Sequence, residues 1–279
     1  MKTKKPLMIF IAVTLASGWL GVLLDKVLTD QPEGNSLGMG LWLILPFLAA
    51  LILRIVSRDG EGMGLKPNFR KSCVWYLAAL LIYPVVTIIV LGLAAFTGGV
   101  ELSGDKTALL SLAATAFLFQ FVKNIFEEFA WRGYLTPKLI ELKLSDWSIY
   151  TISGLVWGLW HAAYYIVFLP DGDYFMSMPR GIYMLYAVLL MVCWNVMYVE
   201  IYRLAGSVWP CVLMHAIEDA VPALLVAEGY IVFTGVYDIV FNPASGIIAT
   251  GLFLAVGFIL RSIRIRKELR SDKKSIELG

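Results

Sequence analysis

The chain has 279 residues, of which 59% are hydrophobic and 16% are charged, and its formal net charge is +2. Soluble domains are nearer about 45–50% apolar and about 25% charged. This composition therefore excludes an ordinary soluble protein and indicates an integral membrane protein in a lipid bilayer. We expect no nucleic-acid partner, because the nearly balanced charge offers no excess of basic residues.

Eight segments are long and apolar enough for a membrane-spanning helix, which needs about 20 residues. Transmembrane barrel strands would be near ten residues with strict alternation, so the length of these runs favours helices. The sequence predicts an all-α polytopic membrane protein of about eight transmembrane helices. The predicted spans are 6–25, 37–56, 74–97, 107–126 (running on to about 136), 147–169, 181–203, 207–228 and 244–262.

The basic residues predict the orientation of these spans. The first apolar run, Pro6 to Leu24, is too long for a signal peptide and precedes no A-x-A site, so we interpret it as an uncleaved span. With the N-terminus in the cytoplasm, the inside segments contain all of the 23 Lys and Arg residues except four. These four are Lys26, Lys106, Arg180 and Lys123. We expect both termini to be cytoplasmic and the protein to reside in the cell membrane.

The chain shows no internal repeat and no second domain. We divide it into N-terminal transmembrane helices (1–104), a central group of helices that contains the polar motifs described below (105–228), and a last helix with a basic cytoplasmic tail (229–279). These parts are expected to form one structural unit. Cys73, Cys193 and Cys211 lie in or beside apolar segments without paired spacing, so we interpret them as small hydrophobic residues.

The first polar motif lies near the end of the fourth predicted span. On a helix, Lys123 and Glu127 are four residues apart and share a face, as do Glu128 and Arg132. Two intrahelical ion pairs are one interpretation. The other is catalytic: if Arg132 neutralises Glu128, the adjacent Glu127 is available as a general base.

The only two histidines, His161 and His215, both lie inside apolar stretches. Ionisable groups are costly in hydrocarbon, so they tend to face the interior of a helix bundle and to mark function. His215 and Asp219 are four residues apart, and Asp219 could orient the imidazole, share a metal with it, or line an oxyanion site. Glu218 points about a quarter-turn away and is expected to have a supporting role.

A carboxylate and two histidines on three membrane helices fit two mechanisms. In one, Glu127 takes a proton from water while the histidines hold the water and the scissile carbonyl. In the other, two histidines and a carboxylate hold a metal with an open position for water, as catalytic zinc requires. Both predict hydrolysis of an amide bond within the bilayer.

Three motifs in this order resemble the CPBP family of intramembrane proteases. That family includes the type II CAAX prenyl protease and bacterial bacteriocin-immunity and lysostaphin-resistance proteins. The resemblance covers about residues 105–225. The motifs are Glu127-Glu128-x-x-x-Arg132, Trp157-Gly-Leu-Trp-His161 and His215-x-x-x-Asp219.

The resemblance implies a CAAX-protease-like bundle of eight helices with a conical catalytic cavity open to the cytosol. It implies that Glu127 activates the water with His161, while Glu128 and the arginine of the first motif have supporting roles. His215 and Asp219 would stabilise the oxyanion or bind metal. The family has been described as glutamate-type and as metal-dependent. Zinc, held by Glu127, His161, His215 and Asp219, is therefore a candidate cofactor, and the glutamate-type route needs none.

The chain departs from the family pattern at two positions. Trp157 stands where the family usually has Phe, which keeps a large aromatic side chain. Asp219 stands where the family often has Asn, and an ionised Asp cannot donate a hydrogen bond to an oxyanion. Asp219 could instead orient His215, bind metal, or donate when protonated, which slightly favours the metal route.

The favoured function is an intramembrane endopeptidase that cleaves a membrane-associated or lipidated peptide or protein near the cytoplasmic face. A proton-coupled transporter could use the same Glu and His residues as a relay. No inverted repeat or matching pair of broken helices supports it. A third alternative is an immunity or scaffold protein that keeps the fold without catalysis, and the complete set of candidate groups argues against this loss.

Overall fold

The computed structural model describes residues 4–28, 30–32, 35–58, 63–103, 107–170, 178–233 and 235–277, with side chains as far as Ser271. Its long helices are α1 (Lys4–Val27), α2 (Leu37–Ser57), α3 (Phe69–Phe96), α4 (Leu109–Ala130), α6 (Asp146–Trp160), α7 (Arg180–Ala205), α8 (Trp209–Glu218) and α11 (Ile247–Glu277). The shorter ones are α5 (Thr136–Glu141), α9 (Leu224–Ala227) and α10 (Val236–Phe241).

Seven helical stretches among these residues are long and apolar enough to cross a membrane. The predicted all-α polytopic membrane protein is therefore confirmed. Each stretch corresponds to one of the eight predicted spans. The stretches are Lys4–Val27, Leu37–Ser57, Phe69–Phe96, Leu109–Glu141, Arg180–Ala205, Trp209–Ala227 and Ile247–Ser271.

The remaining predicted span, 147–169, is not one continuous helix. Helix α6 ends at Trp160, and the backbone N–H of the next residue, His161, donates to the Gly158 carbonyl at 3.1 Å rather than to Trp157. A π-helical segment, η2 (Tyr164–Phe168), follows. The hydropathy of the segment is that of a span, but the backbone changes its hydrogen bonding at the histidine.

Two further π-helical segments interrupt helices at the other motifs. Segment η1 (Trp131–Leu135) continues α4 and contains Arg132, and η3 (Asp219–Ala223) continues α8 and begins at Asp219. In η3, Pro222 lacks the N–H that would bond to the carbonyl of Glu218, which disrupts the α-helical pattern there. Since π-bulges are frequent at functional sites, their position at all three motifs singles out this part of the fold.

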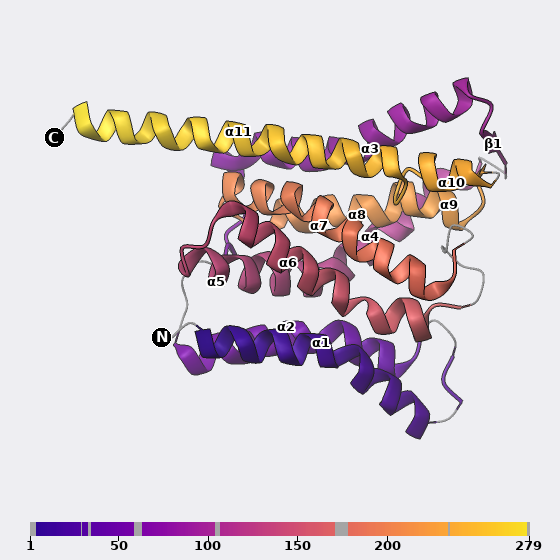
Figure 1. Cartoon of the computed structure of the whole chain (residues 1–279), viewed down its shortest axis with the longest axis horizontal. Coiled ribbons are helices and arrows are strands. Elements are labelled where there is room, and N and C mark those ends of the chain that lie inside the picture. The colour runs from indigo at the N-terminus through magenta and orange to yellow at the C-terminus, as the bar shows by residue number, and fades with distance from the viewer. Residues whose placement is uncertain are drawn as a thin grey trace.

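The helices are arranged in layers (Figure 1). Helices α1 and α2 pack together on one side, α4, α6, α7 and α8 lie in the middle, and α3 and α11 lie on the other side. The start of α1 and the end of α11 lie toward the same end of the bundle (Figure 1). The middle layer is covered on both sides, and its buried polar side chains, among them Glu127, Asn195 and His215, are shielded from lipid.

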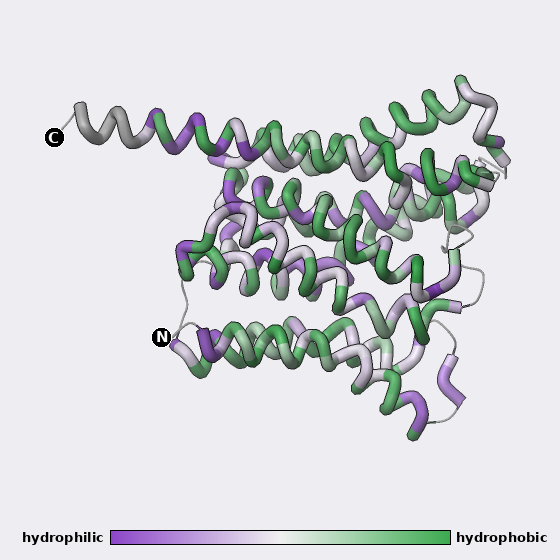
Figure 2. The backbone as a smooth tube through the Cα atoms, viewed as in Figure 1, coloured by the Kyte–Doolittle hydropathy of each residue, from purple (hydrophilic) through white to green (hydrophobic). Residues whose placement is uncertain are grey.

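The outer faces of the helices carry apolar side chains. Green, hydrophobic residues predominate along the helices in Figure 2, and the hydrophilic colours gather toward many helix ends and in the turns of α11 that precede its grey part. Leu110 and Phe119 on α4 are 82% and 71% exposed, which in a bilayer means contact with lipid. A small antiparallel sheet joins β1 (Val100–Leu102) to β2 (Ile231–Phe233), with Val100 opposite Phe233.

Candidate active site

The first motif forms the two ion pairs that its spacing predicts. Arg132 Nη1 donates to both oxygens of Glu128, at 2.9 and 3.0 Å, and both side chains are fully buried. Lys123 Nζ lies 3.4 Å from Glu127 Oε1. The two adjacent carboxylates are thus paired with different cations on their own helix.

Arg132 is also held from α6 and α7. Its guanidinium lies between the rings of Trp157 and Tyr198, with distances of 4.5 and 4.3 Å to the two ring centroids. Its Nη2 donates to Asn195 Oδ1 at 2.9 Å. A buried charge is costly unless it is paired and hydrogen-bonded, and these contacts from three helices meet that requirement.

Asn195 is a site residue that the sequence analysis missed. Its Nδ2 donates to the carbonyl of Tyr150 at 2.8 Å and to Ser153 Oγ at 2.6 Å, so α6 fixes its orientation. A buried amide in the middle of an apolar helix is the signal that could have found it, because polar residues inside membrane bundles bond between helices.

The second histidine is oriented by Glu128 rather than by Asp219. His215 Nδ1 lies 2.9 Å from Glu128 Oε1. Asp219 Oδ2 instead accepts from Lys123 Nζ at 2.9 Å and from Asn124 Nδ2 at 2.8 Å. The expectation that Asp219 orients His215 is therefore wrong. A carboxylate forms stronger hydrogen bonds with an ammonium than with a neutral donor, and Lys123 on the neighbouring helix is within reach.

The first histidine lies at the end of α6 among aromatic rings. Its Nδ1 is 2.9 Å from the Trp157 carbonyl, which is free because the backbone N–H of His161 bonds elsewhere. A carbonyl can only accept, so Nδ1 carries the hydrogen and Nε2 of the neutral ring offers a lone pair. Trp160 packs edge-on at 4.6 Å and Tyr165 stacks at 5.6 Å, which fixes the ring.

Glu127 has one carboxylate oxygen without a partner. Its side chain is 3% exposed, and Oε2 is buried with no hydrogen bond to any described residue. Glu127 interacts electrostatically with both histidines as well as with Lys123. An unpaired buried acceptor is costly, so its presence marks a position where a water or substrate group would bind.

The structure brings the four predicted catalytic residues to the junction of α4, α6 and α8. Trp157 connects the two histidines, since its ring centroid lies 6.4 Å from that of His161 and 5.5 Å from that of His215. Glu127, His161 and His215 are buried, and Asp219 is partly buried. The arrangement provides a free carboxylate oxygen, an imidazole lone pair and a second imidazole held by a carboxylate.

A metal ion fits the arrangement poorly. Within the described part of the chain, the group whose possible ligand atoms lie within 4.8 Å of one another is His215, Glu218 and Asp219. Glu127 and His161 are not part of it, which differs from the predicted ligand set. Asp219 Oδ2 already accepts from the Lys123 ammonium, whose charge would repel a divalent ion at that carboxylate.

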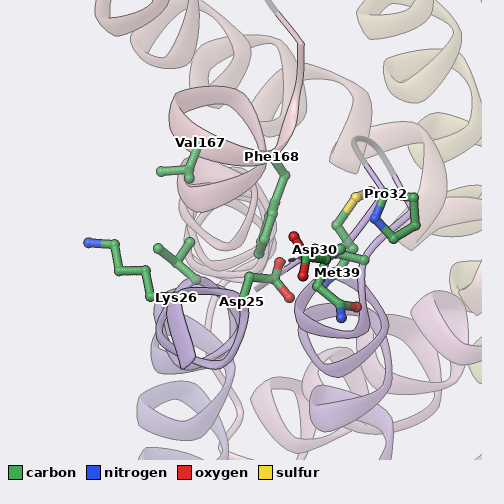
Figure 3. Close-up of a pocket in the computed structure, with 10 residues that line it drawn as sticks. Asp25, Lys26, Asp30, Pro32, Met39, Val167 and Phe168 are labelled. Atoms are coloured by element: carbon green, nitrogen blue, oxygen red, sulfur yellow. Dashed lines mark hydrogen bonds between the residues drawn. The ribbon is translucent and has the colours of Figure 1, made fainter. Parts of the chain in front are cut away.

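A cavity of about 360 Å³ lies elsewhere, between the end of α1, the start of α2 and η2. In Figure 3 the Phe168 ring points into this space and Asp25 faces it, whereas Lys26 points away. Asp25 accepts from the backbone N–H of Gly38 at 2.8 Å and from Ser36, so it caps the start of α2. None of the predicted catalytic residues lines this cavity.

Comparison with known proteins identifies the segment that carries these groups. The family model described as type II CAAX prenyl endopeptidase Rce1-like matches residues 109–221. This match begins with α4, ends within η3 and contains all three motifs, and it confirms the resemblance noted in the sequence. No match was found among curated proteins. Residues 109–221 therefore match the Rce1-like family of type II CAAX prenyl endopeptidases, and they lie within a multi-pass, all-α membrane protein.

Proposed function

We propose that this protein hydrolyses a peptide bond of a membrane-associated or lipidated peptide or protein, near the cytoplasmic face, with a water activated by Glu127. The buried and unpartnered Oε2 of Glu127, inside a domain of the Rce1-like family, carries this proposal. The two buried histidines with which Glu127 interacts supply the other polar groups that such a reaction needs.

In the first step Glu127 acts as a general base. Its carboxylate takes a proton from a water while the water oxygen forms a bond to the carbonyl carbon of the substrate. The electron pair of the C=O π bond moves to oxygen and gives a tetrahedral oxyanion. The lone pair on His161 Nε2 accepts the other hydrogen of the water and so directs the attack.

In the second step the oxyanion collapses. The C=O bond forms again, the C–N bond breaks, and Glu127 returns its proton to the leaving nitrogen. His215 is held through Nδ1 by Glu128, so that Nε2 faces the reaction. When His215 carries both protons, Nε2–H donates to the oxyanion, and Glu128 stabilises the charge of the ring.

A metal-dependent route remains the alternative chemistry for the same reaction. A zinc ion held by His215, Glu218 and Asp219 would polarise the carbonyl or lower the pKa of its bound water. The Lys123 ammonium at Asp219 argues against it. One zinc per purified chain, with activity lost on chelation and restored by zinc, would favour this route over the glutamate-type mechanism.

The distribution of basic residues indicates at which face of the membrane the reaction takes place. The start of α1 and the end of α11 lie toward the same end of the bundle, which agrees with an even number of crossings (Figure 1). Most Lys and Arg residues belong to segments at that end of the predicted topology. We propose that this end is cytoplasmic and that the substrate reaches Glu127 from it.

A cleavage assay on the full chain in proteoliposomes tests the proposal. The probe is a quenched-fluorescence peptide library, with one half farnesylated on a cysteine near the C-terminus and the other half unmodified. Glu127→Gln, His161→Ala and His215→Ala are each expected to lower kcat by about 10²–10⁴-fold. Glu101→Gln, at an exposed glutamate of β1, is the matched control and should keep full activity.

The comparison between the two halves of the library identifies the substrate class. Preference for the farnesylated half would indicate a prenylated substrate, and equal cleavage would indicate recognition of the peptide alone. Full activity in a Glu127→Gln variant with wild-type thermal stability would contradict the proposed function.

A further inference from the structure

Lys123 is the first charged residue of α4 and follows a largely apolar stretch of that helix. Charged groups in spanning helices are costly and usually pair with one another. The Lys123 side chain is only 25% exposed, and its Nζ lies 2.9 Å from Asp219 Oδ2 and 3.4 Å from Glu127 Oε1. Its ammonium therefore connects the proposed base on α4 to the last motif residue at the start of η3.

Asp219 acts as an acceptor in this arrangement. Its Oδ2 accepts from both Lys123 Nζ and Asn124 Nδ2. Since these bonds favour the ionised carboxylate, Asp219 has no hydrogen to donate to a substrate oxygen. An amide side chain at this position could donate such a bond, and the aspartate cannot.

An ammonium group has three N–H donors. The contacts of Lys123 with Asp219 and Glu127 account for two of them, and the third is available to another acceptor. Lys123 lies beside the carboxylate that activates the water. The carbonyl attacked by that water is therefore brought close to the same ammonium.

We infer that Lys123 is a catalytic residue, whose ammonium donates to the developing oxyanion a hydrogen bond that the ionised Asp219 cannot supply. This inference rests on the proposed function. Asn124 and Asp219 are then positioning residues, because they hold the ammonium through Asp219 Oδ2. A cation at the oxygen where charge develops lowers the barrier most in a site that excludes water.

Substitutions at positions 123 and 219 distinguish donation to the oxyanion by Lys123 from simple neutralisation of the Asp219 charge. Lys123→Met is expected to lower kcat by about 10²–10³-fold, as the loss of one oxyanion donor does, with KM changed much less. In K123M/D219N the amide supplies a donor and no carboxylate is left unpaired at position 219, so kcat should recover to within about tenfold of wild type. In K123M/D219A the charges are removed equally but no donor replaces the lysine, so kcat should stay about 10²-fold low.

The contrast between the two double variants decides the inference. It is measured on the best-cleaved peptide of the quenched-fluorescence library, with thermal unfolding in detergent recorded for each variant. The inference is overturned if Asn at 219 restores no more activity than Ala, or if a folded Lys123→Met variant keeps wild-type kcat. If Lys123→Met does not fold, the two double variants still provide the comparison, because neither leaves an unpaired carboxylate at 219.

Failure of this inference can be told apart from failure of the proposed function. An inactive Glu127→Gln variant together with a fully active Lys123→Met variant would remove only the role of Lys123. An active Glu127→Gln variant would remove the proposed function itself. Lys123→Arg, which keeps the charge and the donors, should retain more activity than Lys123→Met.

Discussion

Among the residues that the structure describes, two clusters of charged side chains differ in how completely their polar atoms are paired. The motif cluster lies between α4, α6 and α8. The ion-pair cluster lies where the start of α6 meets the end of α7 and the middle of α11. The motif cluster consists of Lys123, Asn124, Glu127, Glu128, Arg132, His161, Asn195, His215 and Asp219. The ion-pair cluster consists of Asp146, Tyr150, Glu200, Arg203, Arg261, Arg264 and Glu268.

The buried and partly buried carboxylates of the ion-pair cluster are paired with arginines. Glu200 is fully buried and accepts from Arg264 Nε at 2.7 Å and from the Tyr150 hydroxyl. Asp146 accepts from Arg203 at 2.7 Å, from Arg261 at 2.9 Å and from Arg264 at 2.6 Å. Fully satisfied buried networks make a structure rigid, so this cluster holds α6, α7 and α11 together.

The motif cluster is paired on one side and open on the other. Glu128 and Asn195 bond the two terminal nitrogens of Arg132, whereas Glu127 Oε2, Asn124 Oδ1 and Arg132 Nε have no hydrogen-bond partner among the described residues. This difference distinguishes the charged groups that stabilise the fold from those that are available for catalysis. Completed pairs stabilise the fold, and an unpaired buried oxygen is available to a ligand.

Substitution of Glu127 should have the largest effect on activity and little effect on stability. Glu127→Gln removes the base but keeps the size of the side chain. We expect about a 10³-fold fall in kcat with an unchanged midpoint of thermal unfolding in detergent. The exposed Glu101→Gln control should change neither. A large fall in unfolding temperature would instead make Glu127 a structural residue and remove the contrast between the clusters.

Substitution of Glu200 should have a large effect on stability and little effect on activity. Glu200→Ala leaves Arg264 without its main buried partner, which costs about 3–5 kcal/mol for a broken buried pair. The free energy of unfolding, measured by denaturant titration in mixed micelles, should fall by that amount. The kcat per folded molecule should remain within about threefold, because the cluster contacts none of the reacting groups. A selective loss of kcat with normal stability would contradict this assignment.

Substitution of Asn195 tests the part of the motif cluster in which Arg132, Glu128 and Asn195 are paired. Asn195→Ala removes the acceptor for Arg132 Nη2 and the bonds to α6, which costs about 1–3 kcal/mol for the unsatisfied buried donor. Arg132 then holds Glu128, and through it His215, less firmly. We expect about a tenfold fall in kcat with KM changed less. Asn195→Asp restores the acceptor and should recover part of the activity, which a purely packing role would not produce.

Substitution of Asp146 should have the smallest effect of the four. This effect is on the unfolding temperature, and it should depend on pH. Partial burial would raise the pKa of Asp146, but hydrogen bonds from Arg203 and Arg264 outweigh it and hold the pKa below its usual value. Asp146 therefore stabilises the folded state above about pH 4, the usual pKa of Asp, and this contribution is lost as the pH falls further. Asp146→Asn should lower the unfolding temperature near pH 7 and reduce its fall at acid pH. If the unfolding temperatures of the wild type and of Asp146→Asn fall equally as the pH is lowered, this pH-dependent contribution of Asp146 is contradicted.

Much of the site could be predicted because its signals are local. The two ion pairs of the first motif follow from the four-residue spacing on a helix, and both are present. The same spacing also suggested that Asp219 orients His215, and there it failed, because Lys123 and Glu128 on another helix are the partners. Spacing along one helix identifies neighbours but cannot rank them against groups on other helices.

The sequence by itself determined the class of protein, seven of the eight predicted spans and the three motifs, because hydropathy and helical spacing depend on residues close along the chain. Only the tertiary structure decided that α6 ends directly before His161, that Asn195 and two aromatic rings hold Arg132, and that Lys123 joins Glu127 to Asp219. These contacts join residues far apart in sequence, and their energies depend on burial and on which charges meet. Neither quantity exists until the helices pack.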